Sequence, residues 1–227
     1  MMTLLIATRN AHKVTEIQAI LGPNFRCRTL NEFPDAPAVI EDADTFAGNA
    51  TKKAVELAKW LSIQPPTAKA QSPGPDFVLA DDSGLEVDAL NGAPGVHSAR
   101  FATLDKSENS RDADNNAKLL RLLQAVPLEK RTARFRCVIA LVPVAPGKIE
   151  SASPVCFADE FEPQLFDGAC EGRIQFSASG RSGFGYDPLF VPDGFTESFA
   201  ELGEDVKNQI SHRAGALGKL KAFLTTK

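Results

Sequence analysis

The chain has 227 residues, of which 43% are hydrophobic and 24% are charged, a balance that is ordinary for a globular protein. Its net charge of −4 argues against a sequence-independent nucleic-acid binder, because such proteins normally carry a basic excess. The apolar runs fall far short of the roughly 20 residues that a membrane span needs, and the first residues lack the basic start of a signal peptide. We expect a cytoplasmic protein with neither a nucleic-acid nor a membrane partner.

The amino-terminal part predicts a strand, a helix and a second strand. Leu4–Ala7 is a short apolar run that Thr8–Asn10 interrupts. From Ala11, apolar residues recur every three or four positions until Gly22-Pro23, which is the pattern of an amphipathic helix. A strand around Phe25–Leu30 follows.

A long helix is expected to begin after Thr45, a good N-cap residue, and to end near Leu61. Its apolar stripe consists of Phe46, Ala50, Ala54, Leu57, Ala58 and Leu61. The proline-rich stretch Gln64–Asp76 after it is expected to be a loop.

The most informative stretch begins at Phe77–Ala80, an apolar run that ends in the adjacent carboxylates Asp81 and Asp82. Ser83 and Gly84 follow, and both are typical of turns. The pattern predicts a buried strand that delivers oxygen ligands to the rim of a sheet, where open α/β sheets bind ligands. The alternative is a loop with two solvated acids.

The second half of the chain repeats the alternation of helix and strand. Ser110 is expected to cap a helix whose inward face carries Ala113, Ala117, Leu120 and Leu123. A strand is expected over Ala133–Val142, with Phe135, Cys137, Ile139 and Leu141 alternating on one face. An irregular stretch over Pro143–Phe161 and a strand within Phe161–Ile174 should follow. The last expected element is a helix capped by Ser211, with Ala214, Leu217, Leu220 and Leu224 facing inward. We therefore expect the α/β class and a single domain over residues 1–227.

The four cysteines are widely spaced, and no pair has the Cys-x-x-Cys spacing of a structural zinc site. We expect Cys27, Cys137, Cys156 and Cys170 to be reduced thiols, as in a reducing compartment.

The segment Thr8–Lys13 lies where the first strand meets the first helix. A helix start exposes unpaired N–H groups and a partial positive charge, so it attracts phosphate. Asn10 is placed to cap that turn, Thr8 to offer a hydroxyl group, and Lys13 to reach a phosphate oxygen. The basic side chains of Arg9 and His12 would add to the positive electrostatic potential there. The segment is not a Walker A loop, and an ordinary capped helix with an exposed lysine would have the same residues.

Glu41 precedes the long helix and supplies a second acidic group. Neighbouring residues of a strand point to opposite faces, so Asp81 and Asp82 are not expected to bind one ion together. We expect Asp82 and Glu41 to bind Mg²⁺, which is usually held by one or two carboxylates and substrate phosphates. The alternative for Glu41 is an acid that complements the helix dipole.

Two further motifs are typical of a nucleotide pocket. The run Gly180–Pro188 surrounds Phe184 and Tyr186 with glycines, so an aromatic ring there offers a stacking surface for a base, or else fills the core. His212 and Arg213 occupy the first turn after Ser211, where cations oppose the helix dipole. Basic residues at a position where the helix dipole disfavours them indicate a functional role. The alternative is an ordinary basic turn exposed to solvent.

Five motifs stand in one order: Thr8-x-Asn10-x-x-Lys13-x-x-Glu16, Glu41-x-x-x-Thr45-Phe46-x-x-Asn49-Ala50, Ala80-Asp-Asp-Ser-Gly-Leu-x-Val-Asp-Ala-Leu-x-Gly-Ala-Pro-Gly95, Gly183-Phe-Gly-Tyr-Asp-Pro188 and Ser211-His-Arg213. Together they resemble the inosine triphosphate pyrophosphatase family, hydrolases of non-canonical purine nucleotides. The resemblance extends from Leu4 to about Phe223.

This resemblance implies an elongated, two-lobed mixed sheet flanked by helices, with a central nucleotide cleft, usually in a homodimer. It implies Mg²⁺-dependent cleavage of ITP, dITP and XTP to the monophosphate and pyrophosphate. By position, Asp82 would be the catalytic residue, and Glu41 and Asp82 would bind the metal. The implied substrate-binding residues are Thr8, Arg9, Asn10, Ala11, His12, Lys13, Ser83, Phe184, Gly185, Tyr186, Asp187, Lys207, His212 and Arg213.

The mechanism expected on this basis is attack of water at the α-phosphorus, with Asp82 or Asp187 accepting the proton. Donors at His212 and Arg213 would face a 6-oxo group, whereas the 6-amino group of adenine would leave a buried donor unpaired. Lys13, Asp82 and the His212–Arg213 step should then converge on one nucleotide. Two alternatives are a non-catalytic nucleotide-binding regulator and a Maf-like enzyme acting on modified pyrimidine nucleotides.

Overall fold

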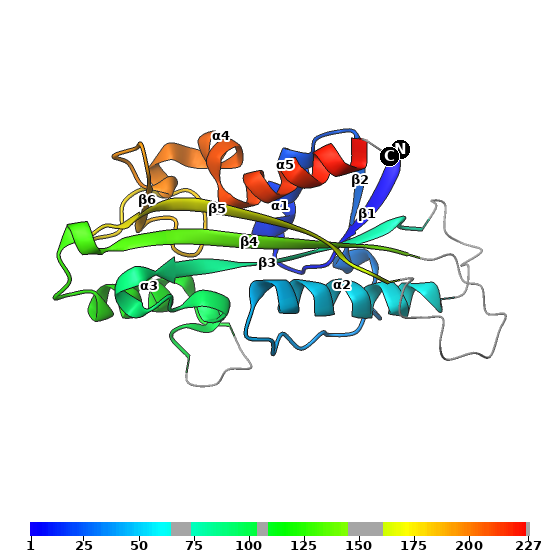
Figure 1. Cartoon of the computed structure of the whole chain (residues 1–227), viewed down its shortest axis with the longest axis horizontal. Coiled ribbons are helices and arrows are strands. Elements are labelled where there is room, and N and C mark those ends of the chain that lie inside the picture. The colour runs from blue at the N-terminus through cyan, green and yellow to red at the C-terminus, as the bar shows by residue number, and fades with distance from the viewer. Residues whose placement is uncertain (65–73, 104–108, 145–160, 226–227) are drawn as a thin grey trace. The chain divides into compact units, whose positions relative to one another are not determined.

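A computed structural model describes residues 1–64, 74–103, 109–144 and 161–225 (Figure 1). Helices alternate with the strands of a six-stranded mixed sheet whose order is β2-β1-β3-β4-β5-β6, so the predicted α/β class is confirmed. The chain divides into two compact units: unit 1 comprises Met1–Asp82 and Val138–Phe166, and unit 2 comprises Ser83–Cys137 and Asp167–Lys227. Most of the predicted loops Gln64–Asp76 and Pro143–Phe161, with Cys156, lies outside the described residues.

Unit 1 contains three strands that run parallel, β1 (Met2–Ile6), β2 (Phe25–Thr29) and the first part of β3 (Phe77–Val87). Its other elements are α1 (Ala11–Leu21), the 3₁₀ helix Leu30–Glu32, α2 (Phe46–Ser62) and parts of β4 (Thr132–Pro143) and β5 (Gln164–Ile174). In the register of the strands, Ile6 pairs with Thr29 of β2 on one side and with Leu79 of β3 on the other. The helix starts predicted at Ala11 and after Thr45 are confirmed.

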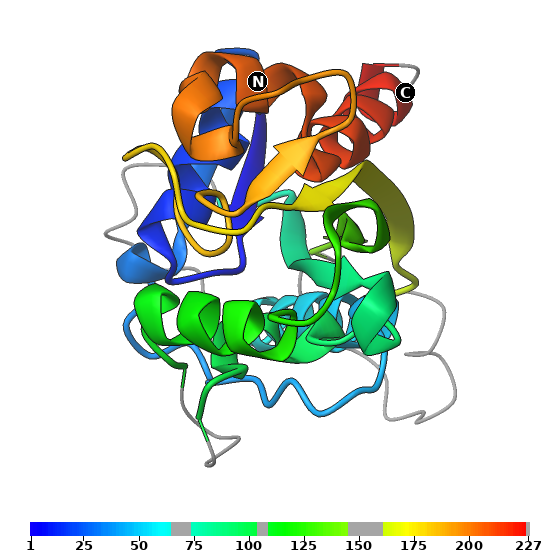
Figure 2. The same ribbon diagram turned by 90° about the vertical axis from the view of Figure 1, so that its left-hand side faces the viewer.

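The strand order of unit 1 creates a switch point between β1 and β3. The chain leaves β1 for β2 on one side and returns to β3 on the other, so right-handed crossovers place α1 and α2 on opposite faces. Figures 1 and 2 both show these helices on opposite sides of β3. In open α/β sheets, ligands bind at such a point, beyond the carboxyl ends of the strands. Thr8–Lys13 follows β1 there, and Asp81 comes two residues after Leu79.

Unit 2 contains the remaining part of β3 and most of the helices of the second half. Its other elements are three short 3₁₀ helices (Asp88–Leu90, Gly95–Arg100, Leu128–Lys130), α3 (Asp112–Leu122), parts of β4 (Thr132–Pro143) and β5 (Gln164–Ile174), β6 (Phe190–Pro192), α4 (Phe199–Ile210) and α5 (His212–Thr225). β6 is antiparallel to β5, with Phe190 opposite Ile174. The strands predicted within Ala133–Val142 and Phe161–Ile174, and the helix capped by Ser211, are confirmed.

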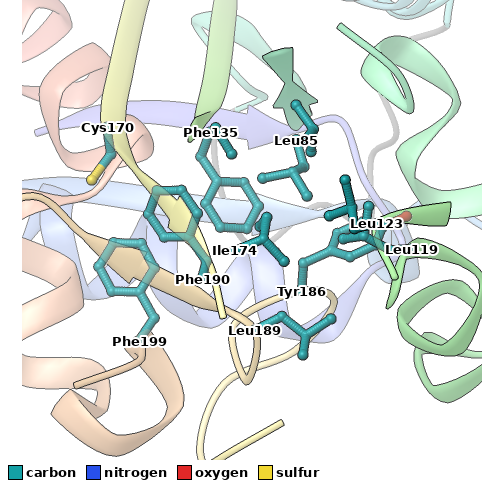
Figure 3. Close-up of a cluster of buried hydrophobic side chains, with 12 residues drawn as sticks. Leu85, Leu119, Leu123, Phe135, Cys170, Ile174, Tyr186, Leu189, Phe190 and Phe199 are labelled. Carbon is teal, nitrogen blue, oxygen red and sulfur yellow. The ribbon is translucent and has the colours of Figure 1, made fainter. Parts of the chain in front are cut away.

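An aromatic core organises unit 2 (Figure 3). The ring centroids of Phe135 and Phe190 lie 4.8 Å apart, and those of Phe190 and Phe199 lie 5.3 Å apart. Tyr186 is part of the same buried cluster. Edge-on and offset ring pairs of this kind add stability beyond the area they bury. The core therefore fixes both the start of α4 and the glycine-rich loop that carries Tyr186.

Two local expectations are wrong. β3 does not end at the acid pair but continues through Ser83 and Gly84 to Val87. Ser110 does not cap α3: the N-cap residue is Arg111, and the Ser110 hydroxyl accepts a hydrogen bond from Thr103 N instead.

The inward face of α3 is only in part the expected one: Leu123 is buried in the core and Leu120 packs against it, but the other two residues differ. Ala113 and Ala117 are exposed, whereas Asn115 and Leu119 are buried. Asn115 tolerates burial because its amide accepts from Ala102 N at 2.7 Å and donates to a second backbone group. Along β4, Phe135, Cys137, Ile139 and Leu141 are all buried as expected, and from Val138 to Val142 the opposite face is buried as well.

Candidate active site

The segment after β1 has the predicted capped geometry. Asn10 Oδ1 accepts hydrogen bonds from His12 N at 3.0 Å and Lys13 N at 3.2 Å, and Asn10 N donates to Thr8 Oγ1 at 3.1 Å. Arg9, Asn10, Ala11 and His12 are exposed. The start of α1 is thus a shaped, positively charged turn at the switch point of unit 1.

Lys13 is anchored by the first acid of the pair. Its ammonium lies 2.5 Å from Asp81 Oδ1, and the Asp81 side chain is completely buried. The carbonyl oxygen of Asp81 accepts a hydrogen bond from Lys53 Nζ at 3.3 Å. Asp81 therefore fixes a cation on α1, and this contact was not expected from the sequence.

Asp82 makes its contact on the opposite side, as neighbouring residues of a strand should. Asn49 Nδ2 of α2 donates to Asp82 Oδ2 at 3.1 Å, and both residues are buried. Lys53, one turn further along α2, lies 3.0 Å from Glu41 Oε1. Side chains on one face of α2 thus contact both of the carboxylates that were predicted as metal ligands.

Burial raises the pKa of Asp82 to about 6. The positive charges of Lys13 and Lys53 act in the opposite direction, and the nearby carboxylate of Glu41 raises the pKa further. The dominant cause is the loss of hydration of the ionised form. A carboxyl group with this pKa exchanges its proton close to neutral pH, as a general base must.

Sequence reasoning assigned no contact to Asn49 or Lys53. Both are buried polar residues on α2, and the spacing of four places them on one face together with the apolar stripe. A polar pair inside a buried stripe was the available signal, because buried polar groups need partners. The partners themselves come from β3 and from the loop before α2.

The donor set of unit 1 suits a hard divalent cation. Asp82 and Glu41 offer carboxylate oxygens, the ligands that Mg²⁺ prefers. Among the described residues, no group of three or more His, Cys, Asp or Glu side chains could hold a metal by itself. A site with two carboxylates is consistent with Mg²⁺, because substrate phosphates and water usually complete its coordination.

In unit 2, the glycine-rich loop is tied to α4 by a buried ion pair. Lys207 Nζ lies 2.6 Å from Asp187 Oδ2, with side chains only 3% and 2% exposed. The same carboxylate oxygen accepts the Phe184 N–H at 2.8 Å, and the Lys207 ammonium lies 4.5 Å from the centre of the Phe184 ring. The half-buried ring of Phe184 is therefore held by both its backbone and a cation–π contact.

Tyr186 has a structural position within this loop. Its ring is 3% exposed in the core, and its hydroxyl donates to Ser98 O at 2.9 Å. Burial raises the pKa of the Tyr186 phenol well above its usual range. Any contact of Tyr186 with a substrate would therefore come from its backbone.

The first turn of α5 buries both of its basic side chains. Arg213 is 1% exposed, and its Nη2 donates to Ser83 Oγ at 2.9 Å. The His212 ring stacks on Phe135 with centroids 4.8 Å apart and planes 12° apart. Gly168 of β5 permits this packing, because a Cβ there would come within 2.0 Å of His212 O. The alternative of a solvated basic turn is excluded.

Comparison with known proteins identifies the family. The model of the Ham1 family matches residues 4–223. The chain belongs to the Ham1 family. A dITP/XTP pyrophosphatase from Desulforamulus reducens is 45% identical over 98% of this chain and 96% of its own length. One from Shouchella clausii is 43% identical over 96% of this chain and 94% of its own length.

Solved structures of Ham1 proteins have the same fold. A HAM1 protein from Coxiella burnetii matches with a TM-score of 0.78 and 34% identity, covering 100% of both chains. A nucleoside-triphosphatase / dITP/XTP pyrophosphatase from Mycobacterium abscessus matches with a TM-score of 0.68 and 35% identity, covering 96% of this chain and 98% of that one. The resemblance inferred from the five motifs is confirmed.

The predicted site residues of this Ham1 chain form one group in each unit. Unit 1 brings together Thr8, Asn10, Lys13, Glu41 and Asp82, with Asp81 as the link to Lys13. Unit 2 brings Phe184 to Asp187 and Lys207, and joins Arg213 to Ser83, the residue that follows Asp82 in the chain. The convergence of Lys13 with the His212–Arg213 step stays a prediction.

Proposed function

We propose that this protein hydrolyses non-standard purine nucleoside triphosphates, namely dITP, ITP and XTP, to the monophosphate and pyrophosphate. The support is its similarity along nearly its whole length to dITP/XTP pyrophosphatases. The observation that carries the chemistry is the buried Asp82, whose raised pKa suits a base, beside a second carboxylate and two lysines. Neither a regulator nor a pyrimidine-specific enzyme is favoured by any contact in the two groups.

We assign the triphosphate to the turn Thr8–Lys13. The start of α1 points its dipole toward the switch point, and the exposed side chain of Arg9 adds positive charge there. Lys13 is oriented by Asp81, which holds the ammonium at the same edge of the sheet. Since little covalent chemistry is left to the protein in phosphoryl transfer, positioning of this kind supplies most of the catalysis.

We assign Mg²⁺ to Asp82 and Glu41, with substrate phosphates and water as the remaining ligands. Bound there, the ion would neutralise phosphate charge and lower the pKa of a bound water. Asn49 and Lys53 would hold the two carboxylates in place through the contacts described above.

Asp82 is the better candidate for the general base. Without bound metal its pKa of about 6 lies close to neutral pH, where a base is most effective, and Mg²⁺ bound to the same carboxylate would lower this pKa. Asp187 is instead tied to Lys207 at 2.6 Å and accepts the Phe184 N–H through the same oxygen. An adjacent ammonium favours the ionised carboxylate and makes it a weaker proton acceptor.

We assign the purine to the group in unit 2. The Phe184 ring, steadied by Lys207, is the candidate stacking surface. Donors of Arg213 and His212 at the start of α5 would face the 6-oxo group. A 6-amino purine would set donor against donor there, which costs about 1–3 kcal/mol.

The test is pyrophosphate release from a panel of nucleotides, with Mg²⁺ and with EDTA. We expect dITP, ITP and XTP to be cleaved about tenfold or more faster than ATP, in line with that cost, and EDTA to abolish the reaction. Asp82→Asn should bind dITP but lose turnover. Equal rates for ATP and ITP, or full activity of Asp82→Asn, would contradict the proposal.

Three further assignments belong to the same proposal: a homodimer, a cytoplasmic location and one enzymatic domain over residues 1–227. They rest on the family resemblance. Among the described residues, no helix combines the length and the apolar character needed to cross a membrane. Sedimentation velocity at several protein concentrations would test the dimer, because a monomer at micromolar concentration would refute it.

A further inference from the structure

Helix α3 forms hydrogen bonds to both backbone polar groups of Gly185, a residue of the loop that carries Phe184. Asp112 Oδ2 accepts the Gly185 N–H at 2.7 Å, and Asn116 Nδ2 donates to Gly185 O at 3.0 Å. The two side chains are four residues apart, so they lie one above the other on one face of α3. Both polar groups of Gly185 are thereby held from outside the loop.

The orientation of the Asn116 amide is determined by its partner. A carbonyl oxygen can only accept, so the amide atom that faces Gly185 O must be the NH₂ group. Its Oδ1 is then buried, with no hydrogen-bond partner among the described residues. An unsatisfied buried acceptor destabilises a fold, so stability alone does not explain an asparagine at this position.

Gly185 stands between the two functional parts of the loop. Phe184 N is bonded to Asp187, and the hydroxyl of Tyr186 is bonded to Ser98 O. Gly185 itself has a positive φ of 63°, a conformation that glycine adopts at little cost. Held only by its neighbours, a glycine with this freedom would let the Phe184 ring change direction.

We propose that Asp112 and Asn116 are positioning residues that hold Gly185, and through it Phe184, in the shape that receives the substrate base. This inference rests on the proposed function for the role of Phe184, but the contact itself is independent of it. The pair acts through the loop and touches no reacting atom. Its loss should weaken substrate binding and leave the chemical step nearly unchanged.

The competing explanation is that Asp112 merely complements the dipole of α3. Asp112 and Asp114 are both acids of the first turn, so both satisfy that role. Asp114 is paired with Arg111 at 2.8 Å and, among the residues that the structure describes, forms no hydrogen bond with the loop. Asp114→Ala is therefore a matched control for Asp112→Ala on the same helix turn.

The chain offers a direct probe of the loop, because Tyr186 is its only tyrosine. Incorporation of 3-fluorotyrosine gives one ¹⁹F resonance at the residue after Gly185. We expect Asp112→Ala and Asn116→Leu to shift or broaden this resonance, and Asp114→Ala to leave it unchanged. Asp112→Asn keeps an acceptor for the Gly185 N–H but removes the charge, so it should restore the parent signal.

Kinetics on dITP provide the second measurement. Asp112→Ala and Asn116→Leu should each raise KM about fivefold, the equivalent of one ordinary hydrogen bond, with kcat within about twofold of the parent. Asp112→Asn should recover most of the loss. Identical behaviour of Asp112→Ala and Asp114→Ala, or no rescue by Asp112→Asn, overturns the proposal. If dITP is not a substrate, the proposed function fails, while the ¹⁹F spectra still decide whether α3 holds the loop.

Discussion

Asn49 Nδ2 donates to Asp82 Oδ2 at 3.1 Å, while Asn49 Oδ1 accepts from Ala43 N at 2.9 Å. The backbone donor of Ala43 fixes the amide orientation, so the group that faces Asp82 must be NH₂. One buried side chain thus connects Asp82 to the loop that carries Glu41, two residues before Ala43. Both predicted metal ligands depend on it.

Replacement of Asn49 by alanine should therefore lower catalysis more than stability alone explains. The change removes the donor to Asp82 and frees the loop of Glu41, and we expect kcat to fall about tenfold to a hundredfold, equivalent to 1–3 kcal/mol. Initial rates at saturating dITP and several Mg²⁺ concentrations measure this. Lys52→Ala is the control, because Lys52 lies on the same helix but pairs with Asp42 at the surface. A parental kcat in Asn49→Ala would contradict the assignment.

The rate should depend on pH through Asp82. Its carboxyl has a pKa of about 6 and must be ionised to accept a proton or bind a cation. We expect kcat/KM at low Mg²⁺ to fall as pH drops through about 6, and higher Mg²⁺ to move this limb to lower pH. An ordinary aspartate would place the limb near pH 4. Observation of the limb at pH 4 with low Mg²⁺ would show that burial does not raise the pKa of Asp82.

The same group should make the active protein less stable than an inactive variant. The pKa of Asp82 is higher in the folded chain, about 6, than the ordinary aspartate value of 3.8. Protonation of Asp82 therefore contributes about 3 kcal/mol to the free energy of unfolding. This contribution is fully present below about pH 4 and is lost as pH rises through 6. In EDTA, Asp82→Asn should unfold at higher urea than the parent at pH 8 and at similar urea at pH 4. A variant that is less stable at pH 8 would refute this linkage.

The buried pair of Lys207 and Asp187 should respond strongly to loss of one partner. Lys207→Met leaves a buried carboxylate without its cation, which costs about 3–5 kcal/mol. The exposed pair of Lys219 and Asp167, with a similar separation of 2.8 Å, is the control. Its loss in Lys219→Met should cost less than about 1 kcal/mol. Urea unfolding of both variants measures the contrast, and equal losses would show that burial does not matter here.

Gly183 should not tolerate a side chain. Its φ is +78°, and a Cβ there would come within 2.2 Å of Asp187 Oδ2. Gly92 has a similar φ of +85° but open space, so Gly92→Ala should cost only the backbone strain of about 1–2 kcal/mol. Gly183→Ala must also displace Asp187 from Lys207, and we expect a loss of about 3 kcal/mol or more. Melting curves that coincide for the two variants would contradict this.

Local sequence patterns predicted the structure correctly where a contact joins residues only a few positions apart. The Asn10 cap of α1, the Thr45 cap of α2 and the Ser211 cap of α5 were all predicted, because a cap bonds N–H groups two or three residues away. Helix α4 was missed, although Ser198 and Glu201 form a capping box at its start. Its interior glycine, Gly203, with φ of 79° breaks the helical pattern that would have revealed it.

The sequence by itself determined the α/β class, the caps of α1, α2 and α5, the order of the motifs and the presence of an acid pair on a strand. Only the tertiary structure decided that β3 continues past that pair, because its backbone is hydrogen-bonded to neighbouring strands of the sheet. It likewise decided that Asp81 holds Lys13 while Asp82 meets Asn49. Caps and periodicity depend on neighbours along the chain, whereas the partners of buried charges come from other elements, and no local pattern specifies them.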